Sequence, residues 1–306
     1  MPEFDPAVAQ ARFDRLAVTP MRTVGAVGGM SPRAIFASAR DIFSHREMLD
    51  LLVKRDLKAR YKDSALGFLW ALARPLVQLA IYFVVLGHFL GAARGIPDFA
   101  VYVFTGLTAM GLFQEIAVGG TASVLANAGL VKKVYMPREL FPLASTGSAL
   151  FNFGIQIVVL LVATILVGAP PLHADILYVF PALLVVLVYG LAFALLFAAI
   201  NVYLRDIQYL VEVATMLLFW MSPVVYSWQM VQGIITNQVA LELYTNNPLT
   251  LAILGFQRAF WVAGDALPSP PLLALRLLIA LVVGVVLLFV AHRVFLRLQG
   301  NFAQEL

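Results

Sequence analysis

The residues best suited to chemistry in this sequence are polar side chains that recur at helical spacing inside long apolar segments. Intervals of three and four residues place side chains in one stripe along an α-helix. Because a polar stripe facing lipid is costly, each stripe must face protein or water. The stripes comprise Arg74, Gln78 and Tyr82 in one segment, Thr105, Thr108 and Glu115 in a second, and Ser145, Ser148, Asn152 and Gln156 in a third.

Two interpretations of these stripes stay open. The first two stripes could line a water-filled path and exchange hydrogen bonds with a hydroxyl-rich molecule, while Trp70, Tyr82, Phe104 and Phe113 offer flat apolar surfaces. Alternatively, the polar groups bond neighbouring helices, as such side chains commonly do in membranes; the third stripe favours this interpretation.

The two charged members of the stripes also have alternative roles. The guanidinium of Arg74 could hold a phosphate through paired donors, or the side chain could extend back to the membrane surface. Glu115 could pair with a base such as Arg74, bond the same hydroxyl-rich molecule, or serve as a structural acid.

Several reaction classes find no support in the sequence. It has no G-x-x-x-x-G-K-[ST] phosphate loop, no metal-ligand spacing among its four histidines, no serine elbow and no cysteine. It also lacks the acid clusters by which an enzyme acting on polyprenyl phosphates would hold a metal ion. We therefore expect no catalytic residues, no metal site and no cofactor in this chain.

The elements that carry the stripes are predicted to cross a membrane. Apolar residues make up 61% of the 306 residues and charged residues 12%, with a mean hydropathy of +0.89. The apolar runs are too long and too uniform for barrel strands, so they predict an all-α membrane protein. We expect six transmembrane helices at Leu69–Gly91, Phe99–Val124, Phe141–Val167, Ile176–Asn201, Ile207–Trp228 and Leu272–His292.

The distribution of basic residues predicts the orientation. Seventeen of the 21 lysines and arginines fall in residues 1–62 and in the segments that the six spans place on the same side. By the positive-inside rule, both termini of this multi-pass protein are expected to lie in the cytoplasm.

The segments outside the spans have their own patterns. Residues 1–30 are expected to be a disordered arm, and residues 31–68 to form an amphipathic helix at the membrane interface followed by a gate segment. Packing of that helix on a soluble partner is the alternative. Before the last span, Leu249–Gly255 and Ala259–Val262 are apolar but too short to cross, which indicates re-entrant or interfacial helices.

Three motifs from about Asp50 onward carry a family resemblance. They are Arg60-Tyr61-Lys62-Asp63-Ser64-Ala65-Leu66-Gly67-Phe68-Leu69-Trp70, Leu130-Val131-Lys132-Lys133-Val134-Tyr135-Met136-Pro137-Arg138-Glu139-Leu140, and Arg205-Asp206 followed by Ser222-Pro223 and Asn247-Pro248. In order and spacing, the chain resembles the permease subunit of ABC-2 type exporters of polysaccharides, O-antigen, galactan and teichoic acid. Residues 69–306 would form the transmembrane domain.

The resemblance implies partners and residue roles. It implies a homodimer that binds two copies of an ABC ATPase, which holds ATP and magnesium, and that exports a lipid-linked polysaccharide; no nucleic acid is involved. An ABC-2 permease for a drug or small lipid is the alternative. The resemblance assigns ATPase coupling, through a cytoplasmic coupling helix, to Leu130, Val131, Lys132, Lys133, Tyr135, Pro137 and Arg138. It assigns a cytoplasmic gate to Arg60, Tyr61, Lys62, Leu66, Gly67 and Trp70. The stripes described above, rather than the resemblance, predict a glycan conduit of Arg74, Gln78, Tyr82, Phe104, Thr105, Thr108, Phe113 and Glu115.

Overall fold

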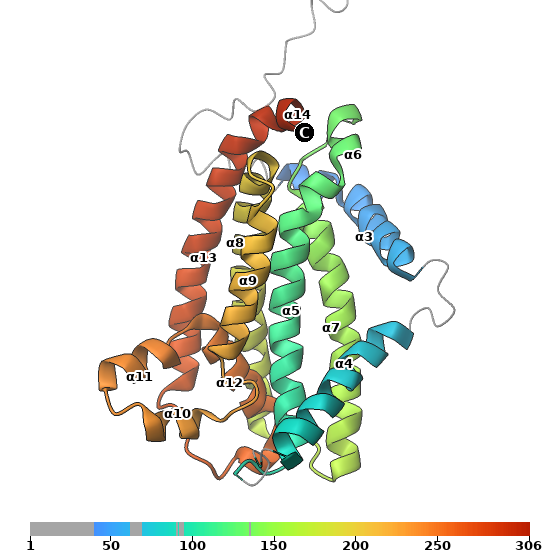
Figure 1. Cartoon of the computed structure of the whole chain (residues 1–306). Coiled ribbons are helices and arrows are strands. Elements are labelled where there is room, and N and C mark those ends of the chain that lie inside the picture. The colour runs from blue at the N-terminus through green and yellow to red at the C-terminus, as the bar shows by residue number, and fades with distance from the viewer. Residues whose placement is uncertain (1–39, 62–68, 90, 92–94, 135) are drawn as a thin grey trace, which may run out of the picture.

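The computed structural model describes residues 40–61, 69–89, 91, 95–134 and 136–306 (Figure 1). The arm expected at residues 1–30 lies outside the described residues, as do residues 31–39 and 62–68 of the predicted interface and gate segment. All regular secondary structure in the described ranges is helical, as predicted.

The bundle has two ends, one of which carries α6, and successive long helices alternate in direction between them (Figure 1). Their bounds are α3 Arg46–Tyr61, α4 Leu69–Ile81, the π-helix η1 Tyr82–Phe89, α5 Phe99–Ala126, α6 Ala128–Lys133, α7 Leu140–Val167, η3 Ala174–Tyr178, α8 Val179–Tyr203, α9 Ile207–Trp220, α10 Trp228–Ile234, α11 Gln238–Thr245, α12 Pro248–Phe260, η4 Val262–Gly264, α13 Leu273–Leu298, η5 Gln299–Asn301 and α14 Phe302–Glu305.

Four helical stretches in the described residues are long and apolar enough to cross a membrane: Phe99–Ala126, Leu140–Val167, Ala174–Tyr203 and Leu273–Glu305. The other two predicted spans correspond to shorter apolar helices, Pro75–Phe89 and Ile207–Trp220. The fifth predicted span was placed too long, because α9 ends at Trp220 rather than at Trp228. Pro223 lies just beyond it and cannot donate a backbone hydrogen bond to continue the helix.

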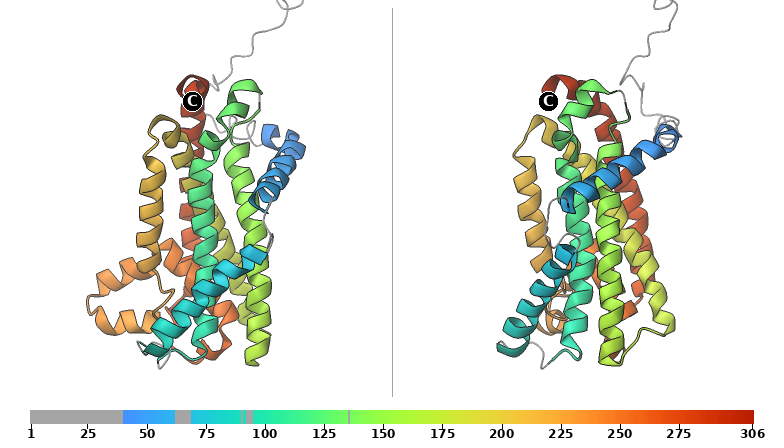
Figure 2. Two further views of the ribbon diagram at one scale, coloured as in Figure 1. Left: turned by 45° about the vertical axis from the view of Figure 1, so that its right-hand side comes forward. Right: turned by 90° about the vertical axis from the view of Figure 1, so that its right-hand side faces the viewer.

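Helix α5 is the central helix of the bundle. Of the residues in its most apolar stretch, 78% are buried, against 22% in the corresponding stretches of α7 and α13. It packs against α7, α8, α9 and α12 (Figure 2). Gly120 allows the closest approach to α8, since a Cβ at this position would lie 2.3 Å from the Cβ of Ala194. The apolar surfaces left exposed lie mainly on α4 with η1, and on α7, α9 and α13.

Helix α3 runs obliquely across α7 (Figure 2). Leu52 is 4% exposed, and Val53 lies over Gly147, where a Cβ would come within 2.8 Å of the valine Cγ2. Part of the apolar face of α3 is therefore covered by its own bundle. The sequence patterns did not indicate this contact.

The segment before α13 differs from the two short helices expected there. Residues 248–260 form one continuous helix, α12, whose N-terminus is capped by Asn247: the Leu249 N–H donates to the Asn247 Oδ1 at 3.0 Å. No proline or glycine interrupts the helix between Gly255 and Phe260, so the two apolar stretches join. Two further helices, α10 and α11, project sideways from the bundle toward the end opposite α6 (Figure 1).

Candidate functional site

A charged centre lies on the side of the bundle where α3, α5 and α7 come together. Arg60 Nη1 lies 3.5 Å from Glu115 Oε1, and the two side chains are 48% and 35% exposed. Asn152 Nδ2 donates to both carboxylate oxygens of Glu115, at 3.2 Å and 3.0 Å. The carboxylate is therefore held from two sides and still reaches the surface of the chain.

The depth of this centre distinguishes it from an ordinary surface ion pair. Glu115 lies three turns from the α6 end of α5, or about 16 Å along the helix axis. A carboxylate at such a depth in a membrane is costly unless it is paired or meets water. Arg60 of α3 is a base beside it, a partner that was not considered from the sequence. The side chain of Arg74 lies outside the described part of the structure.

The other two members of the first predicted stripe, Gln78 and Tyr82, lie on α4 and η1, together with the predicted conduit aromatic Trp70. Gln78 is exposed, and Trp70 is 55% exposed. Tyr82 is half-buried and stacks on Phe219 of α9, with ring centroids 6.1 Å apart and planes inclined by 21°. These side chains are available to a ligand or to a neighbouring molecule.

Four predicted conduit residues on α5 are instead buried inside the bundle. Thr105 and Thr108 are fully buried, and each hydroxyl donates to the carbonyl one turn earlier, at 2.7 Å and 2.8 Å. Phe104 and Phe113 are 2% and 1% exposed, and Phe113 packs edge-on against Phe193 of α8. Their placement favours the helix-packing alternative over contact with a ligand.

The loop predicted to couple to an ATPase contains the short helix α6. Lys132 and Lys133 are exposed at its end, whereas Val131 is 7% exposed and Leu130 packs on the same apolar cluster. The apolar residues thus fix α6 to the bundle and leave its two ammonium groups in solvent. Tyr135 lies outside the described residues.

The second half of this loop is held by the C-terminal end of the same chain. The guanidinium carbon of Arg138 lies 5.7 Å from the centre of the Phe302 ring, a distance suited to a cation–π contact. Glu139 is buried, with its Oε1 3.6 Å from His292 Nε2 of α13. Pro137, which precedes both residues, is half-buried. Arg138 therefore already has a contact within its own chain.

Helix α3 links this loop to the charged centre. Arg55 Nη2 donates to Asn127 Oδ1 at 2.7 Å, and Asn127 Nδ2 donates to the Ser123 carbonyl at 2.8 Å at the end of α5. Sequence reasoning placed Arg55 only on a basic face and assigned it no partner. Arg55 contacts Asn127, which follows the end of α5, and Arg60 contacts Glu115 in the middle of α5. The two arginines therefore join α3 to α5 at two points.

Of the predicted gate residues, the structure describes the side chains of Arg60 and Trp70 alone. Tyr61 ends α3, but its side chain lies outside the described part of the structure. Lys62, Leu66 and Gly67 lie outside the described residues altogether.

At the opposite end of the bundle, an ionic clamp fastens α11 to α13. Arg276 donates from Nη1 to Glu242 Oε2 at 2.5 Å, from Nη2 to Glu242 Oε1 at 3.1 Å, and from Nη1 to Asn246 Oδ1 at 2.8 Å. Hydrogen bonding from this guanidinium lowers the pKa of the Glu242 carboxyl below its ordinary value. Glu242 and Arg276 are 34 positions apart in the sequence, and no sequence motif indicated that they pair.

The sequence of the chain was compared with those of known proteins. A family model described as "ABC-2 type transporter" matches residues 48–261. The O-antigen export system permease protein RfbA of Myxococcus xanthus is 31% identical over 269 residues, which cover 87% of this chain and 98% of that protein. RfbA of Klebsiella pneumoniae is 27% identical over 85% of this chain and 95% of its own length. The polysialic acid transport protein KpsM of Escherichia coli matches a shorter stretch of 84 residues at 31% identity.

Proposed function

The chain belongs to the ABC-2 type transporter family, and we propose that it is the permease subunit of an ATP-driven exporter of a lipid-linked polysaccharide. The observation that carries the export function is the match to O-antigen permeases across nearly their whole length. It agrees with an all-helical bundle containing four helices long enough to span a membrane. We further place the protein in the bacterial plasma membrane, with six spans and both termini in the cytoplasm.

We propose that two copies of the chain form the conduit between them. Polar groups reach the surface of helices that are otherwise apolar: Gln78 on α4 and Glu212 on α9 are exposed, and Glu115 on α5 is half-buried. Tyr82 of η1 stacks on Phe219 of α9, so α4, η1 and α9 form a continuous border beside α5. Lipid disfavours exposed carboxylates, whereas a hydrated space between two protomers would accommodate them.

ATP hydrolysis resides in a separate subunit, as expected for a family of transport pores. We propose that two such ATPases, holding ATP and magnesium, dock against Lys132 and Lys133. The exposed ammonium groups at the end of α6 would meet acidic side chains on the partner. Arg138 and Val131 would support the loop from within the chain rather than contact the ATPase.

We propose that the charged centre acts as the cytoplasmic gate. Arg60 and Glu115 stand where a polymer would pass from the α6 end into the bundle, and they are joined by one long ion pair rather than by a tight bidentate contact. A passing sugar chain could replace this contact with its own hydroxyl groups. A cell-wall galactan or an O-antigen-like glycan would fit such a path.

The test is co-purification of the chain with the ABC ATPase encoded beside it, followed by ATPase assays with purified lipid-linked glycans. The proposal expects glycans to stimulate hydrolysis and small lipids or drugs to leave it unchanged. Stimulation by a drug or short lipid alone would favour the alternative ABC-2 permease and would contradict a glycan exporter.

A further inference from the structure

Helix α13 runs between the two ends of the bundle and is fastened to other elements by side-chain contacts near both of its own ends (Figure 1). It extends from Leu273 to Leu298, which corresponds to about 39 Å along the helix axis. No proline interrupts this range. Because the backbone of an α-helix is closed by hydrogen bonds at every turn, a displacement of one end is carried to the other.

At the α6 end, α13 is joined to the second half of the loop that is predicted to couple to an ATPase. Glu139 is buried, and its Oε1 lies 3.6 Å from Nε2 of His292 on α13. Phe302 of α14 is fully buried, packs edge-on against Phe295 of α13 with ring centroids 5.6 Å apart, and lies beside the guanidinium of Arg138. A movement of this loop therefore acts directly on the end of α13.

At the opposite end, α13 is joined to α11 by the ionic clamp. Arg276 lies in the first turn of α13 and donates to both carboxylate oxygens of Glu242 and to Asn246 Oδ1. The Arg276 side chain is 17% exposed, so the contact is partly shielded from solvent. A bidentate, charged contact of this kind is stronger than an ordinary exposed ion pair. Helix α11 is therefore held firmly to the beginning of α13.

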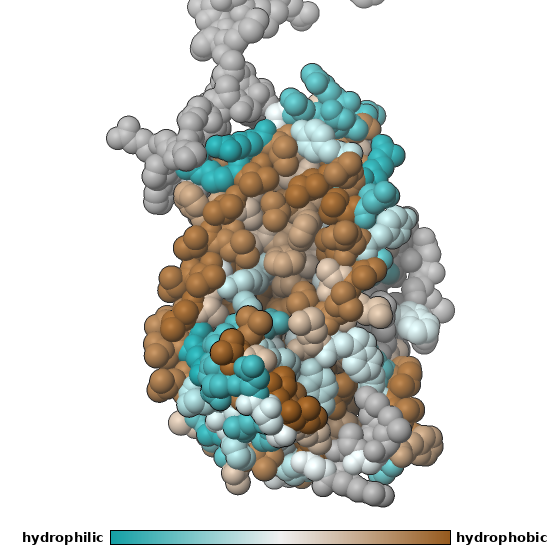
Figure 3. All heavy atoms as spheres, turned by 60° about the vertical axis from the view of Figure 1, so that its left-hand side comes forward, coloured by the Kyte–Doolittle hydropathy of each residue, from teal (hydrophilic) through white to brown (hydrophobic). Residues whose placement is uncertain are grey.

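Between its ends, α13 packs chiefly against α8 and leaves its other side exposed. Near the middle of α13, Gly284 brings the two helices close together, since a Cβ at this position would lie 2.6 Å from Cε2 of Tyr189. The exposed side is apolar and includes Leu275, Leu278, Ile279, Val282, Val283, Val286, Phe289 and Val290. Figure 3, in which the left-hand side of Figure 1 comes forward, shows hydrophobic residues across the middle of the molecule and hydrophilic residues toward its two ends. This packing suits a helix that tilts on α8 about its middle.

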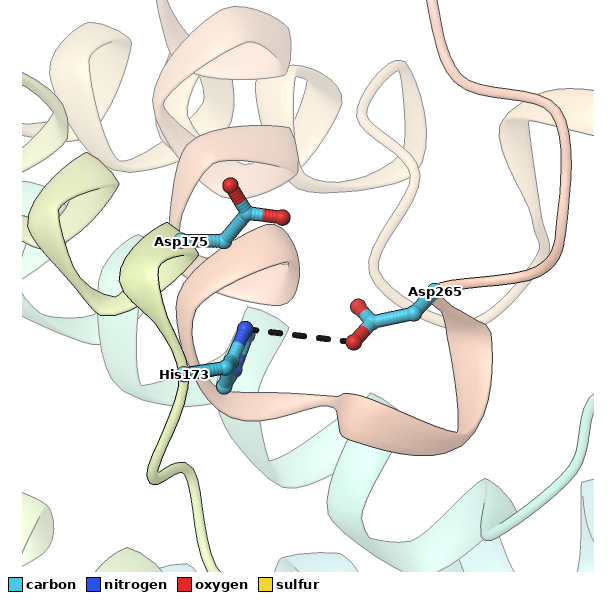
Figure 4. Close-up of side chains that lie close together, drawn as sticks. All are labelled: His173, Asp175 and Asp265. Atoms are coloured by element: carbon cyan, nitrogen blue, oxygen red, sulfur yellow. Dashed lines mark ion pairs between the residues drawn. The ribbon is translucent and has the colours of Figure 1, made fainter.

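The neighbouring helix α12 is fastened by a separate group of charged side chains, which provides a comparison. Arg258, near the end of α12, lies with its Nη2 2.6 Å from Asp175 Oδ2 of η3, the segment that leads into α8. Asp265 Oδ1 lies 3.6 Å from Arg258 Nη1, and His173 Nδ1 lies 3.8 Å from Asp265 Oδ2 (Figure 4). These contacts hold α12 to the beginning of α8. Breaking them should leave the attachment of α11 to α13 intact.

We propose that α13 is a lever that transmits movement of the ATPase-coupling loop to α11 at the opposite end of the bundle, an inference that rests on the proposed function. Phe302 and Arg276 are the positioning residues at its two joints. Nucleotide binding by the ATPase shifts α6 and the loop after it, and Arg138 and Glu139 displace the end of α13. Since α11 is clamped to the first turn of α13, it moves in turn. The far end of the protein thus responds to the ATPase without touching it.

The test uses the absence of cysteine from the sequence, which allows a single introduced thiol to be labelled. Leu243→Cys places an environment-sensitive bimane on α11, and Leu166→Cys places the same label at the end of α7; both positions are exposed. The labelled chain is assembled with its ATPase, and its fluorescence is compared without nucleotide and with ATP, magnesium and vanadate. We expect a shift in emission for Leu243→Cys and none for Leu166→Cys.

Variants at the two joints, made with the label on α11, decide whether α13 carries the movement. Arg276→Gln removes the clamp, and Phe302→Leu removes the aromatic partner of Arg138 while keeping apolar bulk. Each should abolish the emission shift while the ATPase still binds. Asp175→Asn, which breaks the contact of α12, should keep the shift. Exchange of the clamp charges, Arg276→Glu with Glu242→Arg, restores an opposite pair and should recover the shift, which separates a lost joint from a misfolded variant.

Three outcomes would overturn the inference. They are no emission shift in the complex labelled on α11, a shift that survives Arg276→Gln, and a shift lost as fully in Asp175→Asn as in Arg276→Gln. ATPase binding and glycan export by the same preparations report on the proposed function. A complex that exports glycan but shows no shift rejects the lever alone, while failure of the chain to bind the ATPase rejects the exporter and the lever with it.

Discussion

Arg60 at the end of α3 and Glu115 in the middle of α5 lie far apart in the sequence, yet their side chains approach to 3.5 Å at the side of the bundle. Asn152 of α7 donates to both oxygens of the same carboxylate. Three helices thus meet at one acidic group, about 16 Å along α5 from its α6 end. Arg55 of α3 also donates to Asn127 at the start of α6. A movement of α6 would therefore be transmitted to Glu115 through α3 alone.

Exchange of the charges tests the gate. Arg60→Glu places two carboxylates together and Glu115→Arg places two guanidiniums together, so each should lower ATP-dependent glycan export severely through like-charge repulsion. The double exchange restores opposite charges and should recover part of the export, measured in vesicles at equal protein levels. A double variant as poor as the worse single variant would show that the two side chains do not act on each other.

Reversal of the α6 charges tests the coupling loop. Lys132→Glu together with Lys133→Glu should weaken association with the ATPase at least about tenfold, or about 1.4 kcal/mol, because two exposed attractive charges become repulsive. The measurement is the dissociation constant by titration in detergent at two salt concentrations. Lys58→Glu on α3 is the matched control and should bind normally. Unchanged affinity in the double variant would leave these lysines as simple membrane anchors.

Bulk at the surface of α4 tests the conduit. Gln78→Trp should block the export of long chains while leaving protein levels normal, since Gln78 is exposed in the proposed path. Val77→Trp adds the same volume one position along the helix, on a different face, and should export normally. Thr108→Val should also export normally, because that hydroxyl bonds only one turn back in its own helix in the described contacts. Full activity of Gln78→Trp would argue against this path.

Packing of α5 against α8 can be tested at a glycine. Gly120→Ala places a methyl group 2.3 Å from the Ala194 Cβ and should destabilise the fold by about 1–3 kcal/mol. Gly154→Ala on α7 meets no atom within 4 Å and should be neutral or stabilising by about 0.5–1 kcal/mol. Thermal unfolding in detergent, followed by size-exclusion chromatography, measures both. Equal stability of the two variants would contradict the close approach.

The clamp between α11 and α13 predicts a dependence on pH. Arg276 lowers the pKa of Glu242 from its ordinary value of 4.5, so the pair stabilises the fold above that value and the contribution is lost as pH falls through the lowered pKa. Wild type should therefore lose thermal stability on acidification below about pH 4.5 more steeply than Glu242→Gln. Glu47→Gln, at an exposed site on α3, should follow the wild-type slope. Parallel curves for wild type and Glu242→Gln would contradict the clamp.

The sequence predicted the helices better than it predicted their contacts. Apolar runs located α5, α7, α8 and α13 closely, because length and hydropathy are local properties. Helical spacing found Glu115, Thr105 and Thr108 on one stripe, but it could not say which of them face the interior. That depends on the neighbours of α5: burial on nearly all sides leaves the threonines fully enclosed, while Glu115 reaches Arg60 and the surface.

The partners missed from sequence are all long-range. Arg55 with Asn127, Arg60 with Glu115 and Glu242 with Arg276 each join separate helices, and a single sequence contains no signal that pairs them. The helices α10 and α11 did carry a local signal. Ser227 caps α10 through the Met230 N–H, and Asn237 caps α11 through the Val239 N–H.

The central claim is that this chain carries a glycan across the membrane only together with a separate ATPase subunit. The most direct measurement is transport of a lipid-linked glycan in vesicles that contain the chain, its ATPase, or both. The account predicts glycan translocation that requires both proteins and ATP, and that is lost when Lys132 and Lys133 are reversed. Translocation by the chain alone, or failure of the two proteins to associate at any concentration tested, would contradict it.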